Sequence, residues 1–315
     1  MSEQTRFDYQ RAFARNIGLV NEAEQERLRK TCVALPGLGG VGGAHLQTLA
    51  RMGIGAFRLA DPDTFDIVNI NRQLGATTQT VGRNKAEVMA ETLHAINPEA
   101  AVQTFPDGIT EANIDAFLDG VDVVVDGIEF FCMETRRMLY RSCRARNIPV
   151  VNAGPVGMGT AVMVFMPGGP RLEDFFKIDD EMTRAEQLLA FALGNAPGLV
   201  SDVDPRRVDI AGEKGPALAS ACMFCAGAAA TEVLKIVCGR GKLAAAPHGV
   251  YFDPYRGRTF RLRPRPSLRR SLRGRVLRWF AFRRFPVFKQ MHEQELEARS
   301  SGLRAAIAAG QTARP

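Results

Sequence analysis

The chain has 315 residues, of which 46% are hydrophobic and 24% are charged. This composition excludes a disordered chain and a disulfide-stapled miniprotein, and it suffices for one large or two modest domains. The uncharged Ala-rich run at residues 217–231 is shorter than the roughly 20 residues of a membrane-spanning helix, so we expect none. The first residues lack an apolar signal segment, so we expect a cytoplasmic protein whose six cysteines stay reduced.

The formal net charge of +7 is unevenly distributed along the chain. Residues 256–315 contain 15 arginines and one lysine against three glutamates, whereas residues 1–255 are mildly acidic overall. The basic character therefore belongs to one C-terminal segment and not to the surface as a whole, so the charge alone does not indicate a nucleic-acid-binding body.

From residue 29 onward, short apolar or β-branched runs alternate with helical stretches. We expect strands at 32–35, 56–60, 102–105, 123–125 and 148–151, and between them helices at 43–52, 83–96, 111–118 and 133–146. This order, with strands apolar on both faces, predicts an α/β fold: a Rossmann-like, doubly wound, mainly parallel sheet. Runs at 160–166, 249–253 and 257–262 lack such intervening helices, so we expect them to form an antiparallel extension.

The chain divides into three parts: an N-terminal helical segment (1–28), an α/β domain (29–263) and a basic amphipathic C-terminal tail (264–315). Residues 167–216 are rich in Gly, Pro and Asp, with one acidic helix-like segment near 179–193. We interpret them as a crossover loop over the site. Residues 217–238 predict a helix of small side chains, which suits close packing against the sheet or a symmetry mate.

A glycine-rich turn follows the first predicted strand and opens the first helix; its glycines are Gly37, Gly39, Gly40 and Gly42. Glycines allow backbone N–H groups to approach phosphates closely, and a helix N-terminus adds positive potential. Asp61 ends the second strand, where a carboxylate can accept hydrogen bonds from ribose hydroxyls. Together these features predict an adenine nucleotide, without distinguishing NAD from ATP.

Two cations and several amides follow Asp61, namely Asn69, Arg72, Gln73 and Lys85. The two phosphates of a dinucleotide are largely bound by a glycine loop. A triphosphate attacked at its α-phosphorus needs further positive charge where negative charge develops. Arg72 and Lys85 can supply that charge, so the pattern favours ATP.

Two runs carry a family resemblance: GLGGVGGAHLQTLARMGIGAFRLADPDTFDIVNINRQ and TVGRNKAEVMAETLHAINPEA. They resemble the nucleotide-binding core of the ThiF/MoeB superfamily, the bacterial relatives of ubiquitin-activating enzymes. The resemblance extends from about Phe7 to Arg263 and is most specific over 29–152. It implies that residues 29–263 form an ATP-dependent adenylyltransferase domain. Such a domain activates a carboxylate, often the C-terminal glycine of a ubiquitin-like or sulfur-carrier protein, and releases pyrophosphate. It also implies a homodimer.

The resemblance assigns roles by position. It implies that the four glycines line the phosphates, that Asp61 holds the ribose, and that four side chains contact the phosphates: Asn69, Arg72, Gln73 and Lys85. Ala14-Arg15-Asn16 is similar to the family's Ser-Arg-Gln, whose arginine reaches the ATP of the partner subunit. Arg15 is therefore a candidate phosphate contact in trans, and the alternative is an ordinary surface arginine.

The segment after the fourth strand departs from the family pattern. The family has Asp-x-x-Asp-Asn, whose second aspartate works with magnesium, where this chain has Asp126-Gly127-Ile128-Glu129-Phe130. Glu129 keeps a carboxylate for a hard cation, so the candidate Mg²⁺ ligands are Glu129 and Asp126. Alternatively, Asp126 caps the next helix.

The cysteine positions also differ from those of many relatives, which hold zinc with two Cys-x-x-Cys pairs. No cysteine occurs between Cys143 and Cys222, and none follows Cys238, so we expect no zinc. The expected crossover loop has no cysteine either, so we expect adenylation without an obligatory enzyme thioester. We interpret Cys222 and Cys225 as packed hydrophobic side chains.

The tail has apolar residues at helical spacing, with arginines mostly elsewhere around the helix: Leu268, Leu272, Val276, Trp279 and Phe280. Over residues 264–288 this pattern suits an anionic membrane surface or a protein partner, and nucleic acid less well. The apolar stripe can equally pack on the acidic body of this protein. We expect residues 299–315 to be frayed.

Two other functions remain open. An NAD- or FAD-binding oxidoreductase also has a Rossmann-like fold and a glycine loop, and in it Arg72 and Lys85 would lie away from the dinucleotide. The altered segment 126–130 and the added tail would also suit a noncatalytic nucleotide-binding adaptor.

Overall fold

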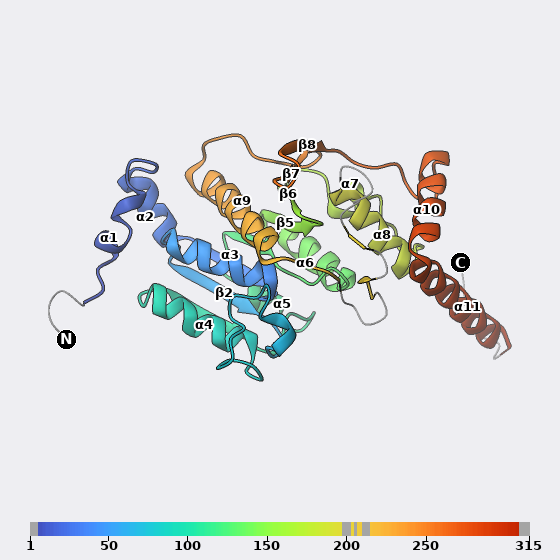
Figure 1. The fold of residues 1–315 in the computed structure, drawn as a ribbon, viewed down its shortest axis with the longest axis horizontal. Helices are drawn as coiled ribbons and strands as arrows, with labels where there is room; N and C mark the ends of the chain where they lie inside the picture. The colour runs from blue at the N-terminus through green and yellow to red at the C-terminus, as the bar shows by residue number, and fades with distance from the viewer. Residues whose placement is uncertain (1–5, 197–202, 205–206, 210–214, 309–315) are drawn as a thin grey trace.

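An eight-stranded sheet runs through the centre of the molecule (Figure 1). The structure is a computed structural model that describes residues 6–196, 203–204, 207–209 and 215–308, the side chains up to residue 301. The strands lie in the order β3-β2-β1-β4-β5-β6-β7-β8. Their bounds are β1 Cys32–Pro36, β2 Ala56–Ala60, β3 Ala101–Phe105, β4 Val123–Asp126, β5 Val150–Val156, β6 Gly159–Phe165, β7 Gly249–Asp253 and β8 Arg258–Leu262.

The pairing of the strands confirms the predicted fold class. Strands β3, β2, β1, β4 and β5 are parallel, and β6, β7 and β8 continue the sheet in antiparallel fashion. In β1, Val33 lies beside Phe57 of β2 and Val123 of β4. The carboxyl ends of β1, β2 and β4 therefore meet at one edge of the sheet, which is where doubly wound folds bind ligands.

Helices cover both faces of the sheet (Figure 1). Their bounds are α1 Tyr9–Ala12, α2 Glu22–Lys30, α3 Gly40–Arg51, α4 Lys85–Ile96, α5 Ile114–Leu118, α6 Met133–Ala145, α7 Leu172–Phe176, α8 Arg184–Asn195, α9 Ala219–Cys238, α10 Leu272–Arg284 and α11 Pro286–Ala308, with short 3-10 helices η2 Ala14–Asn16 and η3 Ile67–Asn69. Alternate β1 residues enter two cores: Val33 and Leu35 pack with α3, α4 and α9, whereas Ala34 joins the core of α5 to α8.

Helix α9 is long and apolar enough to cross a membrane by length and composition, and it is the one such helix within the described residues. Half of it is buried inside the protein, where it packs against α3, β5 and β6. Cys225, Ala229 and Val233 are fully buried in that contact. The helix is thus a core element of this fold, as the small side chains of residues 217–238 suggest.

The segment 167–216, which we expect to be a crossover loop, contains two helices, α7 and α8. Phe175 and Phe176 of α7 and Leu188 of α8 are buried in the second core. Much of this Gly- and Pro-rich segment is therefore packed against the body, and α8 lies beside α6 and β5. The expected acidic helix near 179–193 corresponds to α8 and the turn before it.

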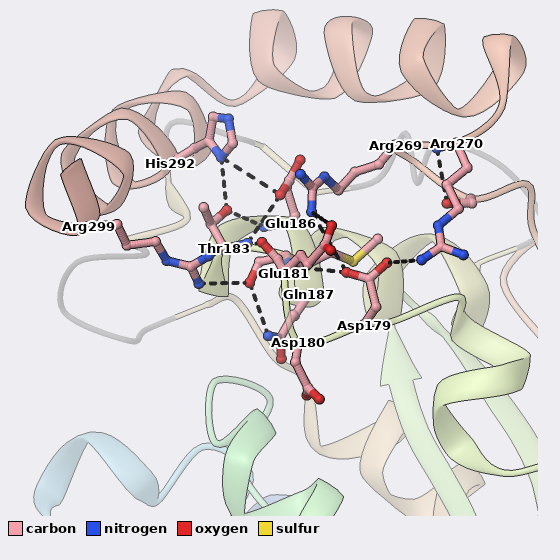
Figure 2. A network of polar contacts seen from close by, with 12 residues as sticks. Asp179, Asp180, Glu181, Thr183, Glu186, Gln187, Arg269, Arg270, His292 and Arg299 are labelled. Atoms are coloured by element: carbon pink, nitrogen blue, oxygen red, sulfur yellow. Dashed lines mark hydrogen bonds and ion pairs between the residues drawn. The ribbon is translucent and has the colours of Figure 1, made fainter. Parts of the chain in front are cut away.

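The C-terminal tail folds back onto α8 (Figure 2). Arg269 Nη1 lies 3.2 Å from Glu181 Oε2, and Arg270 Nη2 lies 3.5 Å from Asp179 Oδ2. A hydrogen bond of 2.8 Å joins Thr183 Oγ1 and His292 Nδ1. One side of the tail therefore packs against the acidic segment of this same protein.

The end of the tail is more ordered than the sequence indicates. Helix α11 continues to Ala308, whereas we expect fraying from residue 299. Arg299 donates hydrogen bonds to the carbonyl oxygens of Glu181 and Met182 and pairs with Glu295. These bonds join the middle of α11 to the turn before α8, and residues 309–315 of the segment expected to be frayed lie outside the described residues.

Candidate nucleotide-binding site

The glycine turn between β1 and α3 is packed main chain to main chain against the end of β4. Gly37 has a φ of +86°, a conformation that favours glycine. A Cβ atom on Gly42 would lie 1.8 Å from the Gly37 carbonyl oxygen, and one on Gly127 would lie 2.3 Å from the same atom. Side chains at these positions would therefore push the turn off the sheet edge, so glycine is required here even before any ligand is considered.

Asp61 ties the glycine turn to the end of β2. Its Oδ2 accepts a 2.6 Å hydrogen bond from Leu38 N, and its Oδ1 accepts one of 2.9 Å from Asp63 N. The side chain is buried, and burial raises the pKa of Asp61 above its ordinary value, while the positive charge of Lys85 opposes that rise. Asp61 thus lies directly beneath the turn, at the position from which the predicted ribose contact would be made.

Lys85, the first residue of α4, pairs with the carboxylate of Asp63, two residues after Asp61. It is 6% exposed, and its Nζ lies 2.9 Å from Asp63 Oδ2. Asn84 caps α4 by accepting hydrogen bonds from Ala86 N and Glu87 N, which fixes the helix start and with it the lysine. The structure therefore places the amine in a buried position at the end of β2 instead of in solvent.

The segment after η3 brings two more predicted side chains to the turn. A Cβ on Gly39 would lie 3.6 Å from Gln73 Nε2, and one on Gly40 would lie 3.5 Å from Arg72 Cγ. The guanidinium of Arg72 donates hydrogen bonds to the main-chain oxygen of Val68 and to the side chain of Asn71. Asn69 has a local role, since its Oδ1 accepts a hydrogen bond from Asp66 N at the start of η3.

Gln73 carries a polar atom without a partner. The residue is buried, and its Oε1 makes no hydrogen bond with the described residues. A buried amide oxygen left unpaired is costly, and such groups in native proteins usually meet a ligand or water. Beside the glycine turn, this orphaned acceptor can take a hydrogen bond from a donor group of a nucleotide, such as a ribose hydroxyl.

The structure separates the two predicted metal ligands. Asp126 Oδ2 accepts hydrogen bonds from Arg136 Nε at 2.8 Å and Tyr140 Oη at 2.9 Å, and its Oδ1 accepts one from Ile128 N. This buried carboxylate is already satisfied by protein donors, so its geometry does not fit a metal ligand. Glu129 is exposed, and its Oε1 accepts a hydrogen bond from Phe130 N. Glu129 is therefore the carboxylate of the pair that is free to meet a cation.

Arg15 lies in η2, far along the chain from the glycine turn of the same subunit. The N-terminal segment is anchored at the other end of α3, where Tyr9 Oη donates to the Gly53 carbonyl oxygen and Asn16 Nδ2 donates to that of Met52. Helix α3 has 12 residues and is about 18 Å long. The exposed Arg15 is thus remote from the site of its own chain, as a contact in trans requires.

Three residues of this region are not among the sequence-predicted site residues: Asp63, which pairs with Lys85; Gly127, which packs on the turn; and Arg136, which holds Asp126. Asp63 is detectable as the second acid of Asp61-Pro62-Asp63, and Gly127 as the glycine that follows β4. Arg136 has no such signal, because it reaches Asp126 from ten residues away through the packing of α6.

The thiols of α9 are buried next to the site. A Cβ on Gly40 would lie 3.0 Å from Cys222 Sγ, and Cys225 Sγ lies 3.4 Å from Thr160 Oγ1. Burial raises the pKa of Cys225 to about 12 and also raises that of Cys222. Both groups are therefore protonated at neutral pH, which agrees with their interpretation as packed hydrophobic side chains.

Comparison with known proteins identifies the class. The ThiF family matches residues 13–271, so this chain belongs to the ThiF family. It is 37% identical over 142 residues to the tRNA threonylcarbamoyladenosine dehydratase of Bacillus subtilis, covering 45% of this chain and 55% of that protein. It is 32% identical over 143 residues to the sulfur carrier protein ThiS adenylyltransferase of Escherichia coli, covering 45% and 56% respectively. The chain spans about half the length of the curated relatives that it matches.

Solved structures show the same fold. MccB from E. coli, crystallised with ATP, superimposes with a TM-score of 0.60 at 20% sequence identity, over 83% of this chain and 72% of that chain. The family membership confirms the ThiF/MoeB resemblance of the sequence, and the structural likeness confirms the predicted architecture.

Proposed function

We propose that this protein is an ATP-dependent adenylyltransferase that activates a carboxylate as an acyl-adenylate and releases pyrophosphate. The observation that supports the proposal is that Asp61, Gln73 and the stem of Arg72 lie next to the glycine turn, while Lys85 pairs with Asp63, whose N–H is bound by Asp61. The names of related proteins, among them an adenylyltransferase, support the same reaction class.

Each part of the site has a role in this reaction. The N–H groups of the turn and the N-terminus of α3 bind phosphate oxygens, and Asp61 accepts hydrogen bonds from the ribose. Arg72 and Lys85 stabilise the negative charge that develops as a carboxylate oxygen attacks the α-phosphorus. The buried Lys85 is the stronger contributor, because charge acts over a longer range away from water.

Mg²⁺ is part of the proposal, with Glu129 as its protein ligand. Magnesium is commonly bound by one or two carboxylates together with substrate phosphates, so a single exposed glutamate beside the phosphate turn suffices. Bound there, the cation would neutralise charge on the leaving pyrophosphate. Arg136 positions Glu129 by donating hydrogen bonds to the carbonyl oxygens of Ile128 and Glu129.

The acyl substrate that we propose is the C-terminal carboxylate of a ubiquitin-like or sulfur-carrier protein, or else a small carboxylate. The buried, protonated Cys222 and Cys225 support release of the adenylate to another nucleophile without an enzyme thioester. We also propose a homodimer in which Arg15 reaches the partner's ATP. Exposed apolar side chains on α9 and β7, Met223, Phe224 and Phe252, support such an interface.

Isotope exchange between pyrophosphate and ATP tests the reaction. With ATP, Mg²⁺ and a panel of carboxylates and carrier-protein C-termini, we expect exchange with at least one acid, reduced about a hundredfold or more by Arg72→Met. Protein that binds ATP but catalyses no exchange with any member of the panel would instead behave as the noncatalytic adaptor. Tight binding of NAD in place of ATP would indicate the oxidoreductase.

A further inference from the structure

Helix α10 has a second apolar side that the fold does not use. Leu272, Val276, Trp279 and Phe280 are 75%, 46%, 55% and 51% exposed. They are spaced three and four residues apart, so they share one side of the helix. The opposite side of α10, which includes Gly274 and Ala281, is buried against the rest of the protein. We call the four exposed residues the outer stripe.

Arginines flank the outer stripe on both sides. At 100° per residue, Arg275 lies on one flank and Arg273 and Arg284 on the other. Arg283 lies within the stripe, with its guanidinium 5.5 Å from the centre of the Trp279 ring. Within the described part of the chain, Arg273 and Arg275 pair with no acidic side chain, and residues 256–284 contain 12 arginines and no Asp or Glu.

Other arginines of the tail pair with acidic side chains of the same chain. Arg269 and Arg270 pair with acids of the segment before α8 (Figure 2), and Arg278 pairs with Glu186 of α8. Docking therefore neutralises one side of the tail and leaves the other side positive and apolar. Figure 1 shows α10 at the edge of the molecule, at the opposite end from α1 and α2.

We propose that the outer stripe and its flanking arginines bind an anionic lipid membrane surface. A helix that lies in a membrane interface has an apolar stripe that enters the acyl boundary, with basic side chains beside it that reach the headgroups. Tryptophan prefers this depth, because its ring is apolar and its N–H is polar. The outer side of α10 has all three features, and its charge is complementary to anionic headgroups.

The aliphatic residues favour lipid over nucleic acid. Single-stranded RNA binds through bases stacked on aromatic rings and phosphates paired with arginine. Leu272 is the most exposed member of the stripe, and neither it nor Val276 offers a surface for stacking. Both gain free energy by leaving water for an apolar medium. The experiment must still distinguish a lipid surface from two other possible partners of the outer stripe, RNA and a second copy of the chain.

The single tryptophan of the chain, Trp279, reports on this surface directly. The full chain is mixed with vesicles of neutral phosphatidylcholine, or with vesicles that also contain about 30% anionic phosphatidylglycerol. With the anionic vesicles we expect a blue shift of Trp279 emission and cosedimentation of the protein. Apparent affinity should be at least tenfold lower for neutral vesicles. Leu272→Ser with Val276→Ser should weaken binding about tenfold or more, and Arg273→Gln with Arg275→Gln should abolish the preference for anionic lipid.

Matched variants lie at the other end of the molecule. Leu19→Ser removes a leucine that is 84% exposed, and Arg11→Gln with Arg51→Gln removes two exposed arginines; both should bind vesicles like the parent chain. Circular dichroism checks that every variant is folded. The proposal is overturned if Trp279 emission ignores vesicles, if it responds to transfer RNA or single-stranded RNA but not to lipid, or if the stripe variant changes the oligomeric mass and leaves vesicle binding unchanged.

Discussion

Gly39 and Gly42 belong to one turn, yet they face different surroundings. A Cβ on Gly42 would overlap the Gly37 carbonyl oxygen at 1.8 Å, whereas one on Gly39 would make ordinary contact with Gln73 at 3.6 Å. Gly42 is therefore required by the packing of the turn. Gly39 has room for a methyl group within the protein, so any need for glycine there comes from the ligand.

These two glycines give a matched pair of variants. Gly42→Ala should lower the free energy of unfolding by about 3 kcal/mol, because the turn must shift. Gly39→Ala should change it by less than about 1 kcal/mol, yet weaken ATP binding at least tenfold, since the methyl group stands where phosphate oxygens approach. Urea unfolding and calorimetric titration measure the two effects. Unchanged ATP affinity in Gly39→Ala would place the phosphates elsewhere.

His45 makes stability depend on pH. Its ring is fully buried in α3, and burial lowers the pKa of His45 to about 4. The unfolded chain takes up a proton near pH 6.5 while the folded chain does not, so stability is full above pH 6.5 and falls as the pH drops toward 4. Between pH 7.5 and 4.5 this one group should remove about 2 to 3 kcal/mol of unfolding free energy.

Replacement by a residue that does not titrate tests this linkage. His45→Met replaces the ring by an apolar side chain of similar volume. Between these pH values its unfolding free energy should fall by about 2 to 3 kcal/mol less than that of the parent. His94→Met, at an exposed position on α4, serves as the control for replacing a histidine by methionine. Parallel pH profiles for the His45 variant and the parent would refute the assignment.

At this scale, the sequence predicted the residues that lie next to one another along a motif better than those brought together by packing. The glycines, Asp61 and Gln73 follow family-like spacing, and the structure places them at one turn, while Lys85 pairs with Asp63, two residues after Asp61. The sequence did not predict the partner of Asp126, because Arg136 meets it only through the packing of the buried face of α6.

Helices α8, α10 and α11 are joined by a buried acid. Glu186 is 1% exposed, pairs with Arg278, and lies 4.0 Å from His292. It also closes the capping box of α8, where its carboxylate accepts a hydrogen bond from Thr183 N. One carboxylate thus supports both the start of α8 and the docking of the tail.

Arg278 should matter more for this docking than the other arginines of the tail. Arg278→Met leaves Glu186 buried without its cation, so we expect α10 and α11 to open more readily, at a cost of about 2 to 3 kcal/mol. Arg270→Met removes a pair whose arginine is 76% exposed and should cost less than about 1 kcal/mol. Hydrogen exchange of the α10 and α11 amides compares them; equal protection in the two variants would contradict the role of Glu186.

Element prediction succeeded where local pattern and burial agree. The expected first residues of strands β1 to β5 differ from the observed ones by at most two residues, because each strand is a short apolar run between helices. Helix α7 was missed, because Phe175 and Phe176 follow a Gly- and Pro-rich stretch and are held by long-range packing. The continuation of α11 beyond residue 299 was missed as well, and Arg299 itself bonds to the turn before α8.

Across the whole molecule, the N-terminal segment and the tail lie at opposite ends (Figure 1). Arg15 is about the length of α3 away from the glycine turn of its own subunit. If a partner subunit supplies this arginine, two defective subunits should complement each other. A dimer of Arg15→Ala and Lys85→Met subunits contains one site with both native residues.

Mixing these two variants, after reversible dissociation, should restore pyrophosphate exchange to about a quarter of the parent activity, because half of the dimers are mixed and each has one intact site. Each variant alone should be nearly inactive. No recovery in dimers shown by mass to be mixed would mean that Arg15 acts within its own chain or not at all.

The overall architecture was predictable for a physical reason. Strands buried on both faces and separated by helices have few arrangements that avoid left-handed crossovers, so a parallel, doubly wound sheet follows, and the structure gives its order as β3, β2, β1, β4 and β5. The docking of the tail did not follow, because its arginines and apolar residues suit the acidic body of the same chain and an anionic membrane surface alike. The structure decided the inner side through Asp179, Glu181 and Glu186.

Nucleotide affinity measured on the parent chain and three variants tests the central claim, that the glycine turn and two cations hold one triphosphate. We expect the parent to bind ATP more tightly than AMP or NAD. Lys85→Met and Arg72→Met should each weaken ATP at least tenfold and AMP less, because two cations beside the α-phosphate attract the more highly charged triphosphate more strongly than a monophosphate. Arg83→Met, a surface cation paired with Glu91, should change neither. Equal losses for ATP and AMP, or a parent chain that prefers NAD, would contradict the account.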